Sequence, residues 1–583
     1  MKTDFDPREN PCRPRHFKPA SCGPLPVEGP AKQTLETSRT RLVLLGALFC
    51  VAFAAIGLRL VDVTVLKDQG PRIARAHVRP HFDHARADIL DRNGVKLATT
   101  LETPSLFANP KLVQGAGDAA AKLAAVLPGL DRQDLEAALS NKERSFVWIK
   151  RNLTPEQQFE VNRLGIPGLF FQTEQRRFYP QGRLTAHVVG FADVDNNGLQ
   201  GVERGLDDEL KTGDGPVTLS IDLRLQYILK EEVTRQIESF SAKGGMGMIA
   251  DVETGEILAM VSLPDFDPND RSAVDSDATF NRATLGTYEM GSVFKIFNTA
   301  MALDSHVTTL GGGYDASHPL QVGRFTIHDD HAKNRWLSVP EIFIYSSNIG
   351  SARMAIDAGI DRQRDFLGRL GLLRAPGLEL PEIGEPHYPR DWRLVNTMTI
   401  AFGHGMSVSP LQMVTGVSAV VNGGILHRAT LLRHPDGYRP EGVRVMAEQT
   451  SDDMRRLLRL VVEKGTGKFA AAPGYLVGGK TGTAEKVDGK GYAHKELLSS
   501  FVAAFPMNQP RYVIMVSIDE PHPNGHSAGE ATGGWVAAPA VSRIVQRMAP
   551  IEGIPPVDED SPEIRRSLLV QSAETPGRKF AAN

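Results

Sequence analysis

Cysteine is scarce in this chain of 583 residues, and its few cysteines are unevenly placed. Cys12, Cys22 and Cys50 lie near the N-terminus, so the sequence beyond Cys50 cannot be cross-linked by disulfides, which suits an envelope compartment without requiring one. The chain also has no strong charge imbalance. It contains 66 Lys and Arg residues and 69 Asp and Glu residues, which gives no reason to expect a nucleic-acid partner. The 16 histidines show no metal-ligand spacing, and we expect neither a metal nor a cofactor. Internal repeats are absent as well, which excludes a solenoid or propeller.

One apolar run near the N-terminus, residues 42–58, contains no charged residue. Its length is at the short end of what crosses a bilayer, and Leu60 and Val61 extend it if the Arg59 side chain reaches the membrane surface. A cleaved signal peptide is the alternative, but its apolar core would be shorter and nearer the N-terminus. We therefore expect an uncleaved transmembrane helix over residues 42–60. The flanking Lys and Arg residues do not decide its orientation, because they are more numerous on the C-terminal side.

Composition and pattern divide the rest of the chain into four segments. Residues 1–41 are rich in proline and should form a disordered cytoplasmic tail. Residues 61–215 alternate short β-prone runs with turns, include a helix expected over Thr154–Arg163, and are interpreted as a non-catalytic platform domain. Residues 216–550 have a different pattern and should form the catalytic domain, and residues 551–583 should form a disordered, solvated tail.

The expected catalytic domain shows strands at both ends with long helical stretches between them. Met246–Ala250 and Ile257–Leu263 flank a Thr-Gly turn and should form an antiparallel hairpin. Phe501–Phe505 and Tyr512–Ile518 should form another, and a strand ending at Lys480 should lie between the two hairpins in the same sheet. This order predicts an α+β domain in which helices pack around an antiparallel sheet, within a multidomain α+β protein.

Three short motifs in this domain point to its chemistry. Ser292-Val293-Phe294-Lys295 places a lysine one helical turn after a serine, so the amine can reach the hydroxyl. Ser346-Ser347-Asn348 follows, and then Lys480-Thr481-Gly482-Thr483. A Ser-x-x-Lys alone is a weak signal, but this is the only one in the chain, and the two later motifs follow it in order. Together the three motifs predict a serine nucleophile with a lysine base.

The three motifs resemble the active site of penicillin-recognising serine enzymes. Further segments narrow the resemblance to class B penicillin-binding proteins, in the division-specific form called FtsI or penicillin-binding protein 3: Arg86–Gly94, Arg177–Gly190, Gly198–Glu203, Asp251–Met260 and Phe402–Gly405. The resemblance runs from about residue 42 to residue 550. It implies a single N-terminal transmembrane helix, an elongated platform domain of the dimerisation type, and a penicillin-binding transpeptidase domain with a serine β-lactamase-like fold.

The chemistry of the Ser-x-x-Lys motif requires a neutral lysine. Ser292 must lose its proton as it attacks a carbonyl, and Lys295 can take that proton only if its own amine is unprotonated. A free lysine titrates near about 10.4, but burial and a nearby cation both lower the pKa. Lys480 is the candidate second cation. The family resemblance makes Lys295 the general base for acylation.

The remaining motif residues receive roles from the resemblance. Ser346 would relay a proton to the leaving amine, and Asn348 would hydrogen-bond the substrate backbone. Backbone amides of Ser292 and Thr483 would form an oxyanion hole. The terminal carboxylate of the substrate would be held, through charge-assisted hydrogen bonds, by Lys480, Thr481, Gly482 and Thr483. In one departure from the commonest family pattern, Met290 stands where proline precedes the Gly-Ser pair, and we expect only a modest effect on the start of the helix.

The leading hypothesis is a D,D-transpeptidase that cross-links stem peptides of septal peptidoglycan and releases D-alanine. Its donors would be lipid II-derived strands, and β-lactams would acylate Ser292 and inhibit it. A carboxypeptidase or β-lactamase would need a base for deacylation, which the sequence does not identify. An inactive scaffold is disfavoured because the motif residues are intact, and a penicillin sensor because the 41-residue N-terminal tail is too short for a signalling domain. The resemblance also implies a glycosyltransferase of the shape-elongation-division-sporulation (SEDS) type and other divisome membrane proteins as partners. It places the chain in the inner membrane with its catalytic domain in the periplasm.

Overall fold

The computed structural model describes residues 43–57, 85–270, 276–323, 325–488 and 491–568. It divides into two units, Met1–Asp83 and His84–Asn583, and each is considered by itself. In the first unit, residues 43–57 form an α-helix whose side chains are exposed. No helix within the described ranges is long and apolar enough to cross a membrane. The predicted span over 42–60 extends past the described helix at both ends, and the predicted tail over 1–41 lies outside the described residues.

The second unit contains a five-stranded antiparallel sheet in the order β16-β17-β18-β8-β9. Its strands are, in chain order, β8 (Gly244–Asp251), β9 (Ile257–Leu263), β16 (Gly478–Asp488), β17 (Gly491–Phe505) and β18 (Tyr512–Asp519). Both predicted hairpins are confirmed, because β8 pairs with β9 and β17 pairs with β18. The α+β architecture predicted for this domain is also confirmed.

The third predicted strand lies at a different position in the sheet from the one that the sequence predicts. The sequence predicts a strand that ends at Lys480 between the two hairpins, but β16 is an edge strand and Lys480 is its third residue. The two hairpins join directly through β18 and β8, where Ile514 pairs with Ile249, so no space remains between them. Among the described strands, β16 pairs only with β17, and the ladder continues to Asp488. One edge of β16 therefore stays available to the active site.

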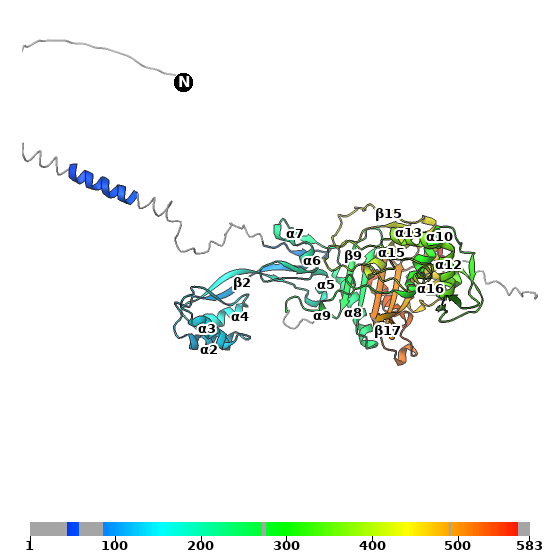
Figure 1. Ribbon diagram of the computed structural model, residues 1–583, viewed down its shortest axis with the longest axis horizontal. Helices are drawn as coiled ribbons and strands as arrows, with labels where there is room; N and C mark the ends of the chain where they lie inside the picture. Colours follow the sequence, from blue (N-terminus) through cyan, green and yellow to red (C-terminus); the bar gives the residue numbers. More distant parts are fainter. Residues whose placement is uncertain (1–42, 58–84, 271–275, 324, 489–490, 569–583) are drawn as a thin grey trace, which may run out of the picture. The chain divides into compact units, whose positions relative to one another are not determined.

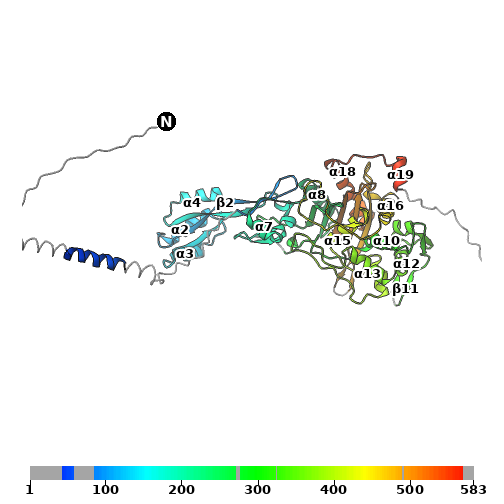
Figure 2. The ribbon, with the colours of Figure 1, turned by 90° about the horizontal axis from the view of Figure 1, so that it is seen from above.

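Side chains of the sheet alternate between two cores, as the two-residue period of a strand requires. On β18, Met515 belongs to one core, whereas Ile514 and Val516 belong to the other. The second core is covered by α8 (Leu223–Ser239) and α18 (Ala538–Ile551). The opposite face of the sheet is covered by α10 (Lys295–Asp304), α12 (Asn348–Ala358), α15 (Pro410–Val421) and α16 (Glu448–Lys464). In Figure 2 the orange strands separate these helices from α8 and α18.

The N-terminal part of the second unit is built on a second sheet. Its strands are β1 (Ile89–Leu90), β2 (Lys96–Ala108), β3 (Val147–Lys150), β4 (Leu169–Phe178) and β7 (Val217–Thr218), with both β3 and β4 paired to β2. A small separate core lies at one end of β2, where Figure 1 shows the helices α2 (Ala116–Val126), α3 (Arg132–Ser140) and α4 (Pro155–Arg163). The predicted helix at Thr154 is confirmed as α4, and Thr154 caps it with a full capping box.

Three of the segments that carry the family resemblance meet in one buried ion-pair network. Glu203 accepts hydrogen bonds from Arg86 Nε and Arg177 Nε, each at 2.6 Å, and its side chain is fully buried. Arg86 also contacts Asp207 at 2.7 Å. Two guanidinium groups share this one carboxylate away from water, so its loss would deprive the buried Arg177 of this ion pair and leave Arg86 with Asp207. These motif residues therefore hold segments of the platform together.

The C-terminal segment differs from the disordered tail predicted over 551–583. Within the part that the structure describes, α19 (Pro562–Leu568) forms, and the side chains of Ile554 and Leu568 are buried. Glu559 pairs with Arg459 of α16 at 2.6 Å and accepts a hydrogen bond from the Gly474 backbone at 2.8 Å. Isolated apolar residues and one partly buried ion pair thus attach a segment whose Pro- and Glu-rich sequence shows no periodic pattern. The remaining residues, 569–583, lie outside the described chain.

Candidate active site

Ser292 lies on a short 3-10 helix, η3 (Gly291–Phe294), which leads directly into α10. Gly291 has φ +53°, and a Cβ at this position would lie 2.4 Å from the Thr483 carbonyl oxygen and 3.3 Å from the Thr483 nitrogen. Only glycine tolerates both this backbone angle and this close approach. The turn that carries the nucleophile candidate is thereby packed against the free edge of β16.

A loop from the opposite side closes on the same turn. Gly403 has φ +91°, and a Cβ there would lie 1.9 Å from the Gly291 carbonyl oxygen. Glu289 fixes this loop, because its carboxylate accepts a hydrogen bond from the Gly405 amide at 2.8 Å and contacts His404 Nδ1 at 3.0 Å. Met290, the departure from the family pattern, is buried between these contacts. Packing on both sides, rather than a proline ring, therefore defines the start of this helix.

The Lys295 amine lies among oxygens of all three predicted residues nearby. Its Nζ is 2.9 Å from Ser292 Oγ, 2.6 Å from the Ser346 carbonyl oxygen and 3.0 Å from Ser346 Oγ. It is also 2.7 Å from Asn348 Oδ1. The carbonyl and amide oxygens can only accept hydrogen bonds, whereas the serine hydroxyls can also donate. A neutral amine has two N–H donors and one lone pair, so the two obligate acceptors use its donors and leave the lone pair for a hydroxyl.

Ser346 sits at the centre of the arrangement in an unusual backbone conformation. Its φ is +58°, in the left-handed region that a serine seldom adopts. Its hydroxyl oxygen lies 3.0 Å from the amines of both Lys295 and Lys480. The following residue, Ser347, caps α12 by accepting a hydrogen bond from the Gly350 amide. Ser347, rather than Ser346, therefore caps this helix.

The Lys-Thr-Gly-Thr segment presents its polar groups along the first half of β16. The amine of Lys480 is fully buried and lies 3.4 Å from Thr481 Oγ1. Thr481 Oγ1 is in turn 2.8 Å from Thr466 Oγ1, and Thr483 Oγ1 accepts a hydrogen bond from the Gly533 amide at 3.1 Å. Gly482 has no room for a side chain, since a Cβ would lie 2.6 Å from the Met290 carbonyl oxygen. A buried amine and hydroxyl groups thus lie beside the nucleophile candidate.

Electrostatics favour a neutral amine at Lys295. Burial lowers the pKa of Lys295 to about 7, against opposing contributions from the carboxylates of Asp330 and Asp329. Burial, followed by the charge of Lys295, holds the pKa of Lys480 well below its usual range. Burial is the first cause of the lowered pKa at both lysines, and the electrostatic repulsion between the two amines is mutual, whichever of them carries the proton. In either case the two amines do not easily carry two protons.

Three further residues near the site belong to no sequence motif that would have identified them in advance. Thr466 extends the hydroxyl row beside Thr481, Glu289 fixes the loop behind the nucleophile candidate, and Asp329 contacts Ser347. Each makes its contact across at least 15 residues of sequence, and no local periodicity signals such a contact. They are found only once the chain is folded.

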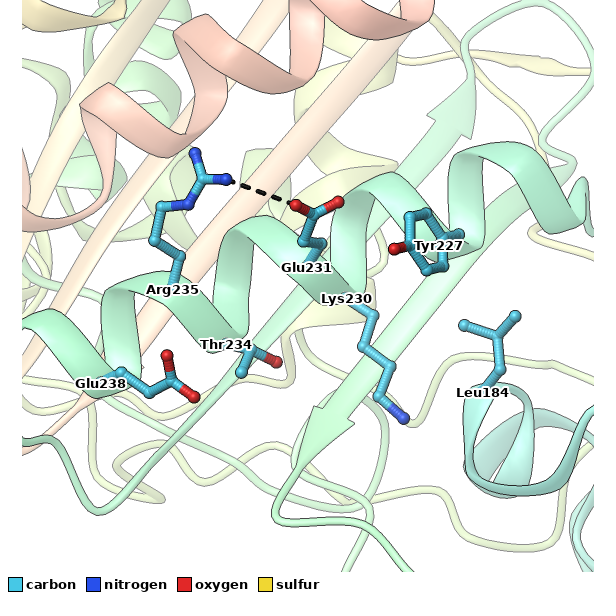
Figure 3. Close-up of a pocket in the computed structure, with 7 residues that line it drawn as sticks. All are labelled: Leu184, Tyr227, Lys230, Glu231, Thr234, Arg235 and Glu238. Atoms are coloured by element: carbon cyan, nitrogen blue, oxygen red, sulfur yellow. Dashed lines mark hydrogen bonds and ion pairs between the residues drawn. The ribbon is translucent and has the colours of Figure 1, made fainter.

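A pocket of about 550 Å³ lies elsewhere, along the solvent face of α8 (Figure 3). Tyr227, Lys230 and Glu231 line it, and the ion pair between Arg235 and Glu231 crosses its rim. None of the predicted site residues lines this pocket. Its size therefore does not make it the candidate active site, which is defined by the converging polar groups around Ser292 and Lys295.

Comparison with known proteins agrees with this arrangement. The family model of the penicillin binding protein transpeptidase domain matches residues 245–546, and that of the penicillin-binding protein dimerisation domain matches residues 83–239. The probable peptidoglycan D,D-transpeptidase FtsI of Caulobacter vibrioides is 40% identical over 505 residues, which cover 84% of each chain. The peptidoglycan D,D-transpeptidase FtsI of Escherichia coli K12 is 28% identical over 85% of this chain and 88% of its own.

Solved structures give the same result. Penicillin binding protein 3 from Mycobacterium tuberculosis, complexed with aztreonam, matches with a TM-score of 0.64 and 25% identity over 81% of this chain and 97% of its own. The transpeptidase domain of penicillin-binding protein 3 from Burkholderia pseudomallei matches with a TM-score of 0.53 and 34% identity over 58% of this chain and 98% of its own. The chain therefore belongs to the class B penicillin-binding proteins, in the FtsI or penicillin-binding protein 3 group. It is a peptidoglycan D,D-transpeptidase.

Proposed function

We propose that Ser292 is the nucleophile of this transpeptidase and that Lys295 is its general base for acylation. The observation that carries the proposal is the set of partners around the Lys295 amine. The Ser346 carbonyl and Asn348 amide oxygens use both donors of a neutral amine, at 2.6 and 2.7 Å, and its lone pair is left to accept the Ser292 proton over 2.9 Å. A lowered pKa makes that neutral form accessible near neutral pH.

The other motif residues complete the acylation step. The Ser292 oxygen forms a bond to the penultimate D-alanine carbonyl carbon, and the peptide bond to the terminal D-alanine breaks. Ser346, within 3.0 Å of both amines, passes the proton on to the leaving nitrogen. Amides of Ser292 and Thr483 stabilise the oxyanion, typically by about 3 kcal/mol per donor. Deacylation by an amine of a neighbouring stem peptide then forms the cross-link.

Recognition of the substrate carboxylate is proposed for Lys480, Thr481 and Thr483, with Gly482 allowing β16 to approach the nucleophile. The buried Lys480 amine loses its usual preference for the charged form, and an incoming carboxylate would restore that preference through a direct ion pair. The amines of Lys480 and Lys295 both lie 3.0 Å from the Ser346 hydroxyl oxygen, so the restored charge would be close to Lys295. Binding of the carboxylate would therefore help to keep Lys295 neutral when the nucleophile is needed.

β-Lactams present a strained amide beside a carboxylate, so the same site should accept them and form a stable acyl-enzyme. The decisive experiment is mass spectrometry of the penicillin-treated protein, with the adduct located on a peptide containing Ser292. Ser292→Ala should abolish labelling, whereas Ser305→Ala, at the other end of α10, should leave it unchanged. An adduct on another residue would contradict the proposal. An acyl-enzyme that turns over within a second would instead indicate a hydrolase.

We further propose a septal role, with residues 42–60 as an inner-membrane anchor and the catalytic domain in the periplasm. The names of the FtsI relatives support the septal role. Large apolar side chains exposed on the described helix, such as Leu44, Leu48 and Phe53, support the anchor. Depletion should give filamentous cells, whereas rounded cells would indicate an elongation role. Removal of residues 1–60 should release the protein from the membrane fraction.

A SEDS-type glycosyltransferase and other divisome membrane proteins are the proposed partners, on the strength of the family alone. Co-purification of the full-length chain with the glycosyltransferase from solubilised membranes tests this association. Loss of co-purification on exchange of residues 42–60 for an unrelated transmembrane helix would assign the contact to the anchor.

A further inference from the structure

The segment His328–Asp330, which follows β12 (Phe325–Ile327), contacts the Ser346–Asn348 turn from the side away from Lys295. The Asp329 carboxylate accepts a hydrogen bond from Ser347 Oγ at 2.7 Å and another from the Ile349 amide at 2.9 Å. The His328 carbonyl oxygen accepts a hydrogen bond from Asn348 Nδ2 at 3.0 Å. Three consecutive residues after Ser346 are thus bound to this short segment.

These contacts matter because the turn adopts a conformation that its own sequence does not favour. Ser346 has a left-handed backbone, and such residues persist only where the surroundings hold them in place. Lys295 holds the turn from one side through the Ser346 carbonyl oxygen and Asn348 Oδ1. Asp329 holds it from the other side. The contact between His328 and Asn348 also orients the amide so that its oxygen, not its nitrogen, faces the amine.

We propose that Asp329 is a positioning residue for acylation, whose carboxylate holds the Ser346–Asn348 turn so that the Ser346 hydroxyl lies between the amines of Lys295 and Lys480. The inference rests on the proposed roles of Ser292, Lys295 and Ser346. The side chain of Asp329 contacts Ser347 and Ile349 rather than Ser292, so it acts through the turn.

Charge gives Asp329 a second effect, which a purely structural residue would lack. The charged groups that face the Lys295 amine are Lys480 on β16 and the carboxylates of Asp329 and Asp330. Both carboxylates raise the pKa of Lys295 against the effect of burial. Loss of either charge should lower that pKa and move the acid limb of the acylation rate profile to lower pH. Asp330 is exposed, so Asp330→Asn removes a charge without removing the hydrogen bonds of Asp329.

The test compares Asp329→Ala, Asp329→Asn and Asp330→Asn by the second-order rate constant of acylation with a fluorescent penicillin. At the pH optimum, Asp329→Ala should slow acylation by about 30- to 100-fold, because small displacements of reacting groups have effects of that order. Asp329→Asn should fall between, since its side-chain oxygen can still accept from the Ile349 amide. Asp330→Asn should keep the wild-type rate at the optimum and show only the shifted acid limb.

A variant of the partner residue makes the test independent of the folding of Asp329→Ala. Ser347→Ala removes the hydroxyl that Asp329 binds and should reproduce part of the loss. Combining it with Asp329→Asn should add little further loss, because both act on one contact. The proposal is overturned if Asp329→Asn and Ser347→Ala acylate at the wild-type rate, or if Asp330→Asn is as slow as the Asp329 variants. Labelling of Ser292→Ala would instead overturn the proposed function, whatever the Asp329 variants do.

Discussion

The pH dependence of acylation follows directly from the environment of the Lys295 amine. Burial lowers its pKa to about 7, and only the unprotonated amine can accept the Ser292 proton. About half of the enzyme should therefore be competent at pH 7, about 90% at pH 8 and about 1% at pH 5. The acylation rate constant should fall about tenfold for each pH unit below 6 and level off above 8. The carboxylate of the penicillin does not titrate in this range, so the change belongs to the protein.

The assay is stopped-flow acylation by a fluorescent penicillin between pH 5 and pH 10. Thermal melting at each pH serves as the control that the protein stays folded. The two buried amines titrate as a coupled pair, so the fitted values belong to the pair, and Lys480→Ala separates them by removing one member. Loss of that neighbouring amine should raise the apparent pKa of Lys295, because the repulsion between the two amines is mutual.

A rate that keeps rising tenfold per pH unit up to pH 10 would refute the reasoning. It would mean that Lys295 keeps the pKa of an exposed lysine despite its burial, and that its contacts to Ser346 and Asn348 are made by a charged ammonium. A rate independent of pH from 5 to 10 would equally exclude Lys295 as the titrating base.

Three further predictions concern the groups that shape the site and the platform. Gly291→Ala should abolish acylation while the protein still folds, because the new Cβ would lie 2.4 Å from the Thr483 carbonyl oxygen on a backbone with φ +53°. Penicillin labelling measures the loss of acylation, and circular dichroism measures the retained fold. Lys480→Ala should weaken the binding of penicillin before acylation by about 100-fold, because a charge-assisted contact to its carboxylate is lost. The concentration of penicillin at which the acylation rate saturates measures this binding. An unchanged binding constant would show that Lys480 does not recognise the carboxylate. Glu203→Ala should destabilise the folded protein by about 3–5 kcal/mol, because Arg177 stays buried without this ion pair and Arg86 keeps only Asp207. An unchanged denaturant midpoint would contradict the network.

Much of the local structure could be predicted because it depends on neighbouring residues. The helix expected over Thr154–Arg163 begins with Thr154 as N-cap, followed by Pro155 and by Gln157, which completes a capping box. The two hairpins followed from alternating apolar runs around turn residues. The order of strands across the sheet did not follow, because pairing of β18 with β8 joins residues more than 250 positions apart. The burial of Ile554 and Leu568 was not predicted either, because isolated apolar residues show no periodic pattern.

The sequence alone identified the residues that are proposed to bear the chemistry. The spacing of Ser292 and Lys295 on one helical turn, and the order of the two later motifs, are properties of the linear chain. Only the tertiary structure decided that Lys295 would meet two obligate acceptors and one hydroxyl, that Ser346 would lie 3.0 Å from two amines, and that Asp329 would support the turn. The physical reason is that burial, and the pKa it sets, arise from groups brought together from distant parts of the chain, so spacing alone cannot reveal them.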